Sequence, residues 1–300
     1  MNDPASRIRR SLAVSIERAL HAALAEGRGD GGGPPGLQRA MEYAVFPGGA
    51  RLRPRLCLTV ACACGDDNRG LADAAAAAIE LLHCASLVHD DLPCFDDAAL
   101  RRGKASVHEA FGERIAVLAG DALIVLAFQS LATAGAMAPH RLVPLMRIVG
   151  QSVGTPHGIC AGQAWECEPA TDLSEYQRAK TGALFAAATM AGAAAAGFEP
   201  SPWRILGERL GEAYQVADDL RDLLSSAAEL GKPVGRDAAL GRPNAAHQFG
   251  VEGARRRLER LLDEAIGSIP ASCPGAAGLR DLILLEASGF LPKEMAQQAA

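Results

Sequence analysis

The chain has 300 residues, a net charge of −5 and a sequence pI near 5.8, and 49% of its residues are hydrophobic. Lysine and arginine are dispersed instead of forming a stripe, so neither composition nor charge indicates nucleic-acid binding. Aromatic residues make up only 4%, alanine runs are long and strand-like alternation is rare, which predicts an all-α protein with one domain over residues 1–300.

Helical periodicity predicts a succession of helices joined by short breaks. The expected helices span Ser6–Glu26, Leu37–Val45, a segment from the Gly-Gly loop in "FPGGARLRPR" to about Cys64, Leu71–Leu92, Ser106–Ala134, His140–Val153, Leu173–Gly197, Pro202–Ser226, Asn244–Ile269 and Ala276–Ser288. Because the breaks are short, neighbouring helices should pack mostly antiparallel in a bundle around a central cavity.

Two apolar runs, Leu71–Val88 and Gly182–Phe198, resemble membrane spans in length. The first carries charged residues and the second is mostly alanine and glycine, so both are interpreted as core helices and the protein is expected not to span a membrane. Eight cysteines occur without a secretory signal at the start of the chain, which favours reduced thiols and a cytoplasmic location.

Three aspartates lie close together in the stretch "YQVADDLRD". On a helix, Asp218 and Asp222 are one turn apart, with about 6 Å between their Cβ atoms, and Asp219 adjoins them. Carboxylates this close repel unless a cation lies between them, and oxygen ligands without cysteine or histidine indicate Mg²⁺ or Mn²⁺. Taken alone, the pattern fits a solvated helix face equally well. These three aspartates form the second aspartate group in chain order.

The first aspartate group, Asp90, Asp91, Asp96 and Asp97, lies at the end of the apolar helix predicted over Leu71–Leu92. Asp90 and Asp96 would point apart on an ideal helix. Because Pro93 disrupts the helix, the chain can loop back and bring Asp96 toward Asp90. Two such groups at the ends of core helices indicate a metal site that faces a cavity.

Cationic residues accompany both aspartate groups, as expected where magnesium links carboxylates to substrate phosphates. Arginine is well suited to binding phosphate oxygens in bidentate fashion. The candidates are Arg101, Arg102 and Lys104 after the first group, Lys232 and Arg236 after the second, Lys180 with Thr181 in "AKTGALF", and Arg51, Arg53 and Arg55 in the Gly-Gly loop.

The sequence contains no P-loop, Rossmann glycine pattern or nucleophile elbow. A clamp of metals and cations without these motifs fits the departure of a diphosphate, in which metal ions neutralise the leaving group and the carbon skeleton becomes a cation. A cavity lined by alanine, leucine and methionine would keep water away from that cation.

These motifs resemble those of the trans-isoprenyl diphosphate synthases, the short-chain head-to-tail prenyltransferases. The resemblance rests on the order and spacing of "GGARLRP", "LLHCASLVHDDLPCFDD", "LRRGK", "AKTGALF", "YQVADDLRD" and "LGKPVGRD", which cover most of the chain. It is strongest to bacterial geranylgeranyl diphosphate synthases that feed carotenoid and bacteriochlorophyll synthesis. The resemblance implies an isoprenoid-synthase-type bundle, a homodimer, and the substrates isopentenyl diphosphate and an allylic diphosphate.

The resemblance also implies a role for each matched residue. Three Mg²⁺ ions would be held by Asp90, Asp96 and Asp218, with Asp91, Asp219 and Asp222 in supporting positions. Arg101, Lys180 and Lys232 would bind the allylic diphosphate, and Arg53, His83 and Arg102 would bind isopentenyl diphosphate. Thr181 and Gln215 would direct oxygens at the allylic cation, and the final proton would leave to the departing diphosphate.

One feature departs from the usual family sequence, and another bears on the length of the product. Ala50 stands where the family loop usually has lysine, so isopentenyl diphosphate should bind more weakly unless Arg51 or Arg55 compensates. Ala85 and Ser86 lie about one turn before Asp90, where a bulky ring would block the growing chain. Since both are small, a twenty-carbon product is expected, with a fifteen-carbon farnesyl product as the alternative.

Other classes remain open on the residues alone. A metal phosphohydrolase of the HD type could use His83, His89, Asp90 and Asp218, but it leaves Lys180 and the arginine pair without a role. A terpene cyclase would be expected to carry Asn and Ser or Thr in the second acidic group. A non-catalytic subunit of a prenyltransferase should have lost one aspartate group, and this chain has both.

Overall fold

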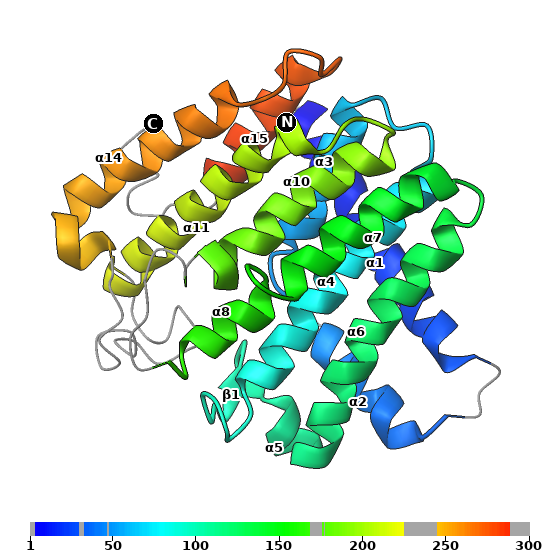
Figure 1. Ribbon diagram of the computed structural model, residues 1–300. Helices are drawn as coiled ribbons and strands as arrows, with labels where there is room; N and C mark the ends of the chain where they lie inside the picture. Colours follow the sequence, from blue (N-terminus) through cyan, green and yellow to red (C-terminus); the bar gives the residue numbers. More distant parts are fainter. Residues whose placement is uncertain are drawn as a thin grey trace.

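A computed structural model describes residues 4–29, 33–46, 48–168, 176, 178–224 and 245–288, and in these ranges the chain is almost entirely helical (Figure 1). The helices are α1 (Pro4–Arg28), α2 (Pro35–Val45), α3 (Leu52–Ala63), α4 (Arg69–Asp90), α5 (Val107–Phe111), α6 (Glu113–Gly135), α7 (Pro139–Val153), α8 (Ile159–Trp165), the π-helix η1 (Arg178–Gly182), α10 (Ala183–Ala195), the 3₁₀-helix η2 (Ser201–Trp203), α11 (Arg204–Leu224), α14 (Ala245–Gly267) and α15 (Ala276–Ser288). The two-residue strands β1 (Leu100–Arg101) and β2 (Lys104–Ala105) pair antiparallel. The predicted all-α fold is confirmed.

Most predicted helices begin and end within a few residues of the observed ones, and three local features differ. The expected helix Ser106–Ala134 is divided into α5 and α6 at Gly112, whose φ of +85° does not fit a helix. The short helix α8 was not predicted, because Pro156 and nearby glycines precede it. The hairpin of β1 and β2 was not predicted either, since strands of two residues carry no periodic signal.

Helix α10 lies at the centre of the bundle and contacts α3, α4, α7 and α11. Every residue from Leu184 to Ala196 is buried. Small residues permit this crowding: a Cβ on Gly192 would overlap the Cys57 carbonyl of α3, and a Cβ on Gly207 of α11 would overlap the Phe185 carbonyl. The alanine-rich, aromatic-poor composition therefore produces closely spaced helices.

Two helices, α4 and α6, are long and apolar enough by length and composition to cross a membrane. In α4, 78% of the most apolar window is buried inside the protein, so it is a core helix, as expected for Leu71–Val88. The run Gly182–Phe198 gives only the 13-residue α10, which is shorter than a typical span. In α6 only 44% of the window is buried, and Val117, Leu118 and Val125 are exposed.

The cysteines agree with the expectation of reduced thiols. All eight lie in the described ranges and all are free. Cys57, Cys64, Cys84 and Cys273 are buried, and the other four are exposed. Burial raises the pKa of Cys64 to about 12, which makes this thiol a poor nucleophile at neutral pH.

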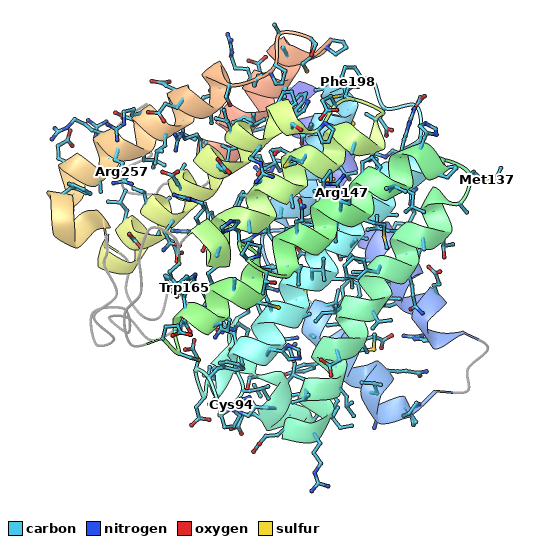
Figure 2. All side chains as sticks on the ribbon, in the orientation of Figure 1. Cys94, Met137, Arg147, Trp165, Phe198 and Arg257 are labelled. Carbon is cyan, nitrogen blue, oxygen red and sulfur yellow. The ribbon has the colours of Figure 1, made fainter. Side chains whose placement is uncertain are left out.

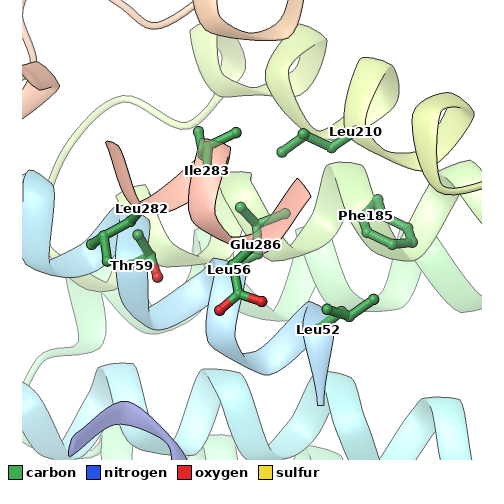
Figure 3. A pocket seen from close by; sticks show the side chains of 8 residues that line it. All are labelled: Leu52, Leu56, Thr59, Phe185, Leu210, Leu282, Ile283 and Glu286. Atoms are coloured by element: carbon green, nitrogen blue, oxygen red, sulfur yellow. The ribbon is translucent and has the colours of Figure 1, made fainter. Parts of the chain in front are cut away.

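The last described helix, α15, packs against α3 and α11 over a small apolar pocket (Figure 3). The pocket is lined by Leu52, Leu56, Thr59, Phe185, Leu210, Leu282, Ile283 and Glu286. Its volume of about 30 Å³ is enough for water but not for a substrate. At its edge Glu286 forms an ion pair with Arg55 of α3, with 2.9 Å between Arg55 Nη2 and Glu286 Oε2. The pocket is thus a packing seam that fixes α15 to α3.

Candidate active site

The first aspartate group lies where α4 ends, and the chain folds back there as predicted. The backbone N–H of Asp96 donates to the carbonyl of Asp90 at 3.0 Å, and the N–H of Ala98 donates to the carbonyl of Asp91 at 3.1 Å. Pro93 lies inside this turn. Asp90, Asp96 and Glu166 each offer a carboxylate oxygen, and these atoms lie within 4.8 Å of one another. The turn therefore brings two predicted aspartates together with a third carboxylate that was not predicted.

Asp91 and Asp97 point away from this group of three carboxylates. Asp91 is buried and binds the Arg101 guanidinium, which donates from Nε at 3.0 and 3.1 Å and also from Nη2. This contact holds Arg101 with its Nη2 only 3.9 Å from Asp90. Asp97 is exposed, has a φ of +46° and lies 4.0 Å from the His108 ring. Asp91 thus positions a cation beside the group instead of joining it.

Lys180 links the first aspartate group to the π-helix η1. Its Nζ lies 3.2 Å from Asp90 Oδ1 and 2.6 Å from Glu166 Oε1. Burial alone would lower the pKa of Lys180, but the negative charge of Asp90, together with Tyr176 and Glu166, outweighs that effect and raises the pKa. The ammonium therefore stays charged at neutral pH. π-Helical turns are rare and occur frequently at functional sites.

Thr181, the next residue of η1, links the site to α11. Its hydroxyl lies 3.5 Å from Gln215 Oε1, and Gln215 donates through Nε2 to Asp219 at 3.2 Å. The adjacent Asp218 accepts a hydrogen bond from Arg221 at 2.9 Å. Lys180 and Thr181 thus connect the two aspartate groups, which lie at the end of the bundle where α4 and α11 both end (Figure 1).

Several predicted site residues lie outside the described part of the structure. They are the side chain of Asp222 and the whole of Lys232 and Arg236. The second aspartate group is therefore represented by Asp218 and Asp219 alone.

Arg53, His83 and Arg102 form a second group, made of two arginines and a histidine. Arg53 Nη1 lies 3.5 Å from His83 Nε2, and the Arg53 guanidinium lies over the Phe185 ring, 4.6 Å from its centroid. Arg53 Nε is buried without a hydrogen-bond partner among the described residues. Burial and the charges of Arg53 and Arg102 hold the pKa of His83 well below its usual value. Donors that are not hydrogen-bonded to a carboxylate among the described residues are suited to receiving an anion.

The Gly-Gly loop makes room for two arginine side chains. A Cβ on Gly49 would lie 2.9 Å from the Arg102 guanidinium, and a Cβ on Gly48 would overlap the Arg51 guanidinium. Arg51 itself is committed to Glu17, Glu80 and the Val45 carbonyl, at 2.9, 2.7 and 2.8 Å.

None of the other cations near the loop is open to a ligand in the described structure. Arg55 is paired with Glu286, so neither Arg51 nor Arg55 takes the place of the lysine that Ala50 replaces. Lys104 donates to the carbonyls of Tyr43 and Phe46 at 2.6 and 2.9 Å. It fastens the β hairpin to α2 and does not face the aspartates, which corrects its expected role in binding phosphate.

The hairpin turn aims the two neighbouring arginines at different groups. Arg102 and Gly103 have φ of +54° and +76°, the left-handed conformations that a two-residue hairpin turn requires. Arg101 consequently reaches Asp91, and Arg102 lies beside Gly49. One tight turn thus supplies both groups of the site with an arginine.

Sequence reasoning missed Glu166 and the residues that hold it. Glu166 follows α8 and accepts hydrogen bonds from Tyr176 and, at 3.1 Å, from Gln163. In Figure 2 Trp165, at the end of α8, and Cys94, in the turn after α4, lie at the same end of the molecule. The sequence signal was weak, because Glu166 is an isolated acid after glycine and proline breaks. Its nearness to Asp90 arises only from packing.

Ala85 and Ser86 lie on α4 before the first aspartate group, as predicted. Ala85 is fully buried, and the Ser86 hydroxyl donates to the His83 carbonyl at 2.8 Å. Neither side chain projects bulk beyond a methyl group or a hydroxyl.

The donor set of the carboxylate group fits magnesium. Asp90, Asp96 and Glu166 supply oxygen ligands only, and no thiol or imidazole is part of the group. Hard oxygen ligands on one side and paired cations on the other are the arrangement expected for a magnesium ion shared with substrate phosphates. The site can therefore hold metal ions and at least one polyanion.

Comparisons with known proteins agree with this chemistry. A family model described as polyprenyl synthetase matches residues 34–274. A geranylgeranyl diphosphate synthase of Cereibacter sphaeroides is 56% identical over 281 residues, which are 94% of this chain and 97% of that protein.

Solved structures give the same result for the fold. A geranyltransferase from Legionella pneumophila has a TM-score of 0.79 and 26% identity, covering 96% of this chain and 99% of that one. A geranyltransferase from Helicobacter pylori, complexed with magnesium and isoprenyl diphosphate, has a TM-score of 0.74 and 28% identity, covering 96% of this chain and 98% of that one.

Proposed function

The chain belongs to the polyprenyl synthetase family, and on this basis we propose that it condenses isopentenyl diphosphate with dimethylallyl, geranyl and farnesyl diphosphate to form geranylgeranyl diphosphate. The observation that carries the proposal is the presence of two groups: carboxylates with Lys180 between them, and Arg53, His83 and Arg102, which are hydrogen-bonded to no carboxylate among the described residues. A reaction that joins two diphosphates needs one site for each. Carotenoid or bacteriochlorophyll synthesis is the pathway that we propose for the product.

Asp90, Asp96 and Asp218 are the proposed magnesium ligands, with one oxygen from each of the first two within 4.8 Å of the other. Three bound ions would neutralise the departing diphosphate. Asp91 supports this arrangement by holding Arg101 beside Asp90. Asp219 supports it by fixing Gln215 through a hydrogen bond of 3.2 Å. Asp222 is proposed as a further supporting residue on its position in the sequence.

Lys180 and Arg101 are proposed to bind the allylic diphosphate, together with Lys232, which lies outside the described residues. Both described cations already contact Asp90, with Lys180 at 3.2 Å and Arg101 at 3.9 Å. A diphosphate bound to metal on Asp90 would therefore lie within their reach. Thr181 and Gln215 stand next to this position and would direct oxygen atoms at the developing cation.

Arg53, His83 and Arg102 are proposed to bind isopentenyl diphosphate. The unpartnered Arg53 Nε leaves a donor available to an anion. Burial, together with the charges of Arg53 and Arg102, lowers the pKa of His83. His83 is neutral in this state, and a diphosphate beside it would favour its protonated form. The binding energy would be used to hold the second substrate with its double bond toward the allylic carbon.

A homodimer is the proposed assembly, with a second copy of the chain covering α6. The exposed side chains Val117, Leu118 and Val125 lie on one face of that helix. The exposed Asp121 lies among them, so the face is a mixed one in which three exposed apolar side chains are available to a partner. Of the two long apolar helices, α4 is buried in the core and α6 has an exposed side. We propose that a second copy of the chain covers this side.

Incubation with labelled isopentenyl diphosphate, each allylic primer and Mg²⁺ tests the function, with product chain length as the readout. We expect a twenty-carbon diphosphate and loss of product when the metal is chelated. A fifteen-carbon end product would make the chain a farnesyl diphosphate synthase. Release of inorganic phosphate from nucleotides without consumption of isopentenyl diphosphate would instead indicate a phosphohydrolase and overturn the proposal.

A further inference from the structure

Glu166 is held by three donors although no role for it follows from the sequence. Its Oε1 accepts from Lys180 Nζ at 2.6 Å and from the Tyr176 hydroxyl, and its Oε2 accepts from Gln163 Nε2 at 3.1 Å. The side chains of Glu166 and Lys180 are only 20% and 21% exposed. The residue as a whole is exposed, but its carboxylate is bound on both oxygens, which fixes it in position before any ligand arrives.

Lys180 has two carboxylate partners, Glu166 and Asp90, which differ in their distance from its ammonium group and in their proposed roles. The distance to Glu166 is 2.6 Å and the distance to Asp90 is 3.2 Å. Asp90 is a proposed metal ligand, so its oxygens must turn to the metal when magnesium and diphosphate bind. Glu166 is anchored in addition by the neutral donors Tyr176 and Gln163, which remain in place when Asp90 turns to the metal. Of the two partners of Lys180, Glu166 is therefore the one with further anchoring contacts.

We infer that Glu166 is a positioning residue for Lys180: it keeps the ammonium aimed at the diphosphate site when Asp90 is taken up by metal. This inference rests on the proposed function. An ammonium has three N–H donors, and in the described structure two of them are directed to Glu166 and Asp90. When Asp90 turns to metal, Glu166 retains one donor and the others point to the incoming phosphate oxygens. Without Glu166, Lys180 would lose its fixed support on a long and flexible side chain.

A different role for Glu166 is direct contact with the metal ions, since its oxygen lies within 4.8 Å of those of Asp90 and Asp96. The two roles are distinguishable. If Glu166 acts through Lys180, its charge should matter only while Lys180 is present. If Glu166 acts on the metals, its charge should matter in both backgrounds.

The test is a double-mutant cycle read out by binding. Calorimetry would measure the affinity of the full-length chain for inorganic diphosphate in the presence of Mg²⁺. The variants are Glu166→Gln, Lys180→Met and the double variant. We expect Glu166→Gln to bind about tenfold more weakly than the unmodified chain, since a charge-assisted contact is lost. In the Lys180→Met background, Glu166→Gln should produce no further loss.

Glu168→Gln is the matched control, because it removes the same charge two residues away from an exposed side chain. It should bind as the unmodified chain does. If Glu166→Gln does not fold, as judged by circular dichroism, Glu166→Asp replaces it. That variant keeps the charge but shortens the side chain away from Lys180, so it should bind more weakly than the unmodified chain and cause no further loss in the Lys180→Met background.

The outcomes separate this inference from the proposed function. An unmodified chain that binds no magnesium and diphosphate would contradict the proposed function itself. Binding by the unmodified chain, with equal affinity in Glu166→Gln, would overturn the positioning role alone. A further loss in the double variant relative to Lys180→Met would also overturn it, in favour of direct action on the metals.

Discussion

Single cations in this protein differ in whether the fold already uses them. Arg51, Arg55 and Lys104 are committed to carboxylates or carbonyls and hold helices, loop and hairpin together. By contrast, the Arg102 guanidinium makes no hydrogen bond or ion pair with any described residue, and Arg53 Nε lacks a partner. A positive charge near an anion site is therefore informative only after its partners are known.

Gly49→Ala should weaken the binding of isopentenyl diphosphate specifically. The new Cβ would lie 2.9 Å from the Arg102 guanidinium, which must move away. We expect KM for isopentenyl diphosphate to rise roughly three- to tenfold, because one charge-assisted contact is weakened. The KM for the allylic substrate should stay the same. Gly36→Ala is the control, since a Cβ there meets nothing within 4 Å. Equal changes in both KM values would contradict the assignment of Arg102.

The stability of the protein should depend on pH through His83. Its folded-state pKa lies well below the unfolded value because of burial first and then of Arg53 and Arg102. The neutral ring therefore contributes stability above about pH 6.5, and this contribution is lost as pH falls toward the folded pKa. The free energy of unfolding in urea should thus fall more steeply for the unmodified chain than for His83→Gln, by up to about 1.4 kcal/mol per pH unit below pH 6.5. Parallel curves for the two proteins would count against a neutral, buried His83.

At the scale of elements, the ends of helices build the site. α4 ends in the turn with Pro93, which returns Asp96 to Asp90. η1 takes a π-helical turn with Lys180 and Thr181, and these two residues reach α4 and α11. The interiors of the helices, in contrast, are apolar and set the distance between neighbouring helices. The site residues therefore lie at the ends of the helices, and the interiors of the helices pack against one another in the bundle.

Ala85→Phe should shorten the product from twenty to fifteen carbons. Ala85 is buried on α4 before the first aspartate group, so a ring there would occupy the space of the growing chain. Product analysis after incubation with farnesyl diphosphate and isopentenyl diphosphate should show little elongation. Ser86→Ala, which adds no bulk, should still give the twenty-carbon product. Unchanged product from an Ala85→Phe protein that is folded and binds diphosphate would defeat the steric explanation.

For the whole molecule, one hydrophobic core joins residues from α1 to α15, and a smaller cluster lies between α11 and α14. The polar site lies at one end of this core. The side of α6 that faces away from the core carries the exposed Val117, Leu118 and Val125 together with the exposed Asp121. The opposite side of α6 belongs to this core through residues such as Leu123 and Leu126, so the exposed side is the one available to the partner copy proposed above.

Leu118→Glu combined with Val125→Glu should convert a dimer to a monomer. Two charges placed in an apolar interface cannot be solvated there, so association should be lost. Light scattering after size-exclusion chromatography measures the mass. Val14→Glu is the control, because it makes the same exchange on the exposed side of α1. A dimer that persists in the double variant, or an unmodified chain that is monomeric, would contradict the proposed interface.

Much of the fold and part of the site could be predicted without the structure. The helix Ala276–Ser288 has the predicted bounds, and the return of Asp96 to Asp90 follows from Pro93. Both depend on interactions within a few residues, which a single stretch of sequence contains. The break at Gly112 and the turn at Arg102-Gly103 are also local, but one glycine or one turn gives too weak a signal to locate them.

The sequence by itself determined the all-α class, the helix that carries each aspartate group and the family motifs. Only the tertiary structure decided which charges meet: Glu166 with Lys180, Asp91 with Arg101, and Arg55 with Glu286. Helical periodicity and proline act over one or two turns of chain, so the residues record them. Pairing between helices depends on atoms coming within a few ångströms, and that spacing is set by packing across the whole core.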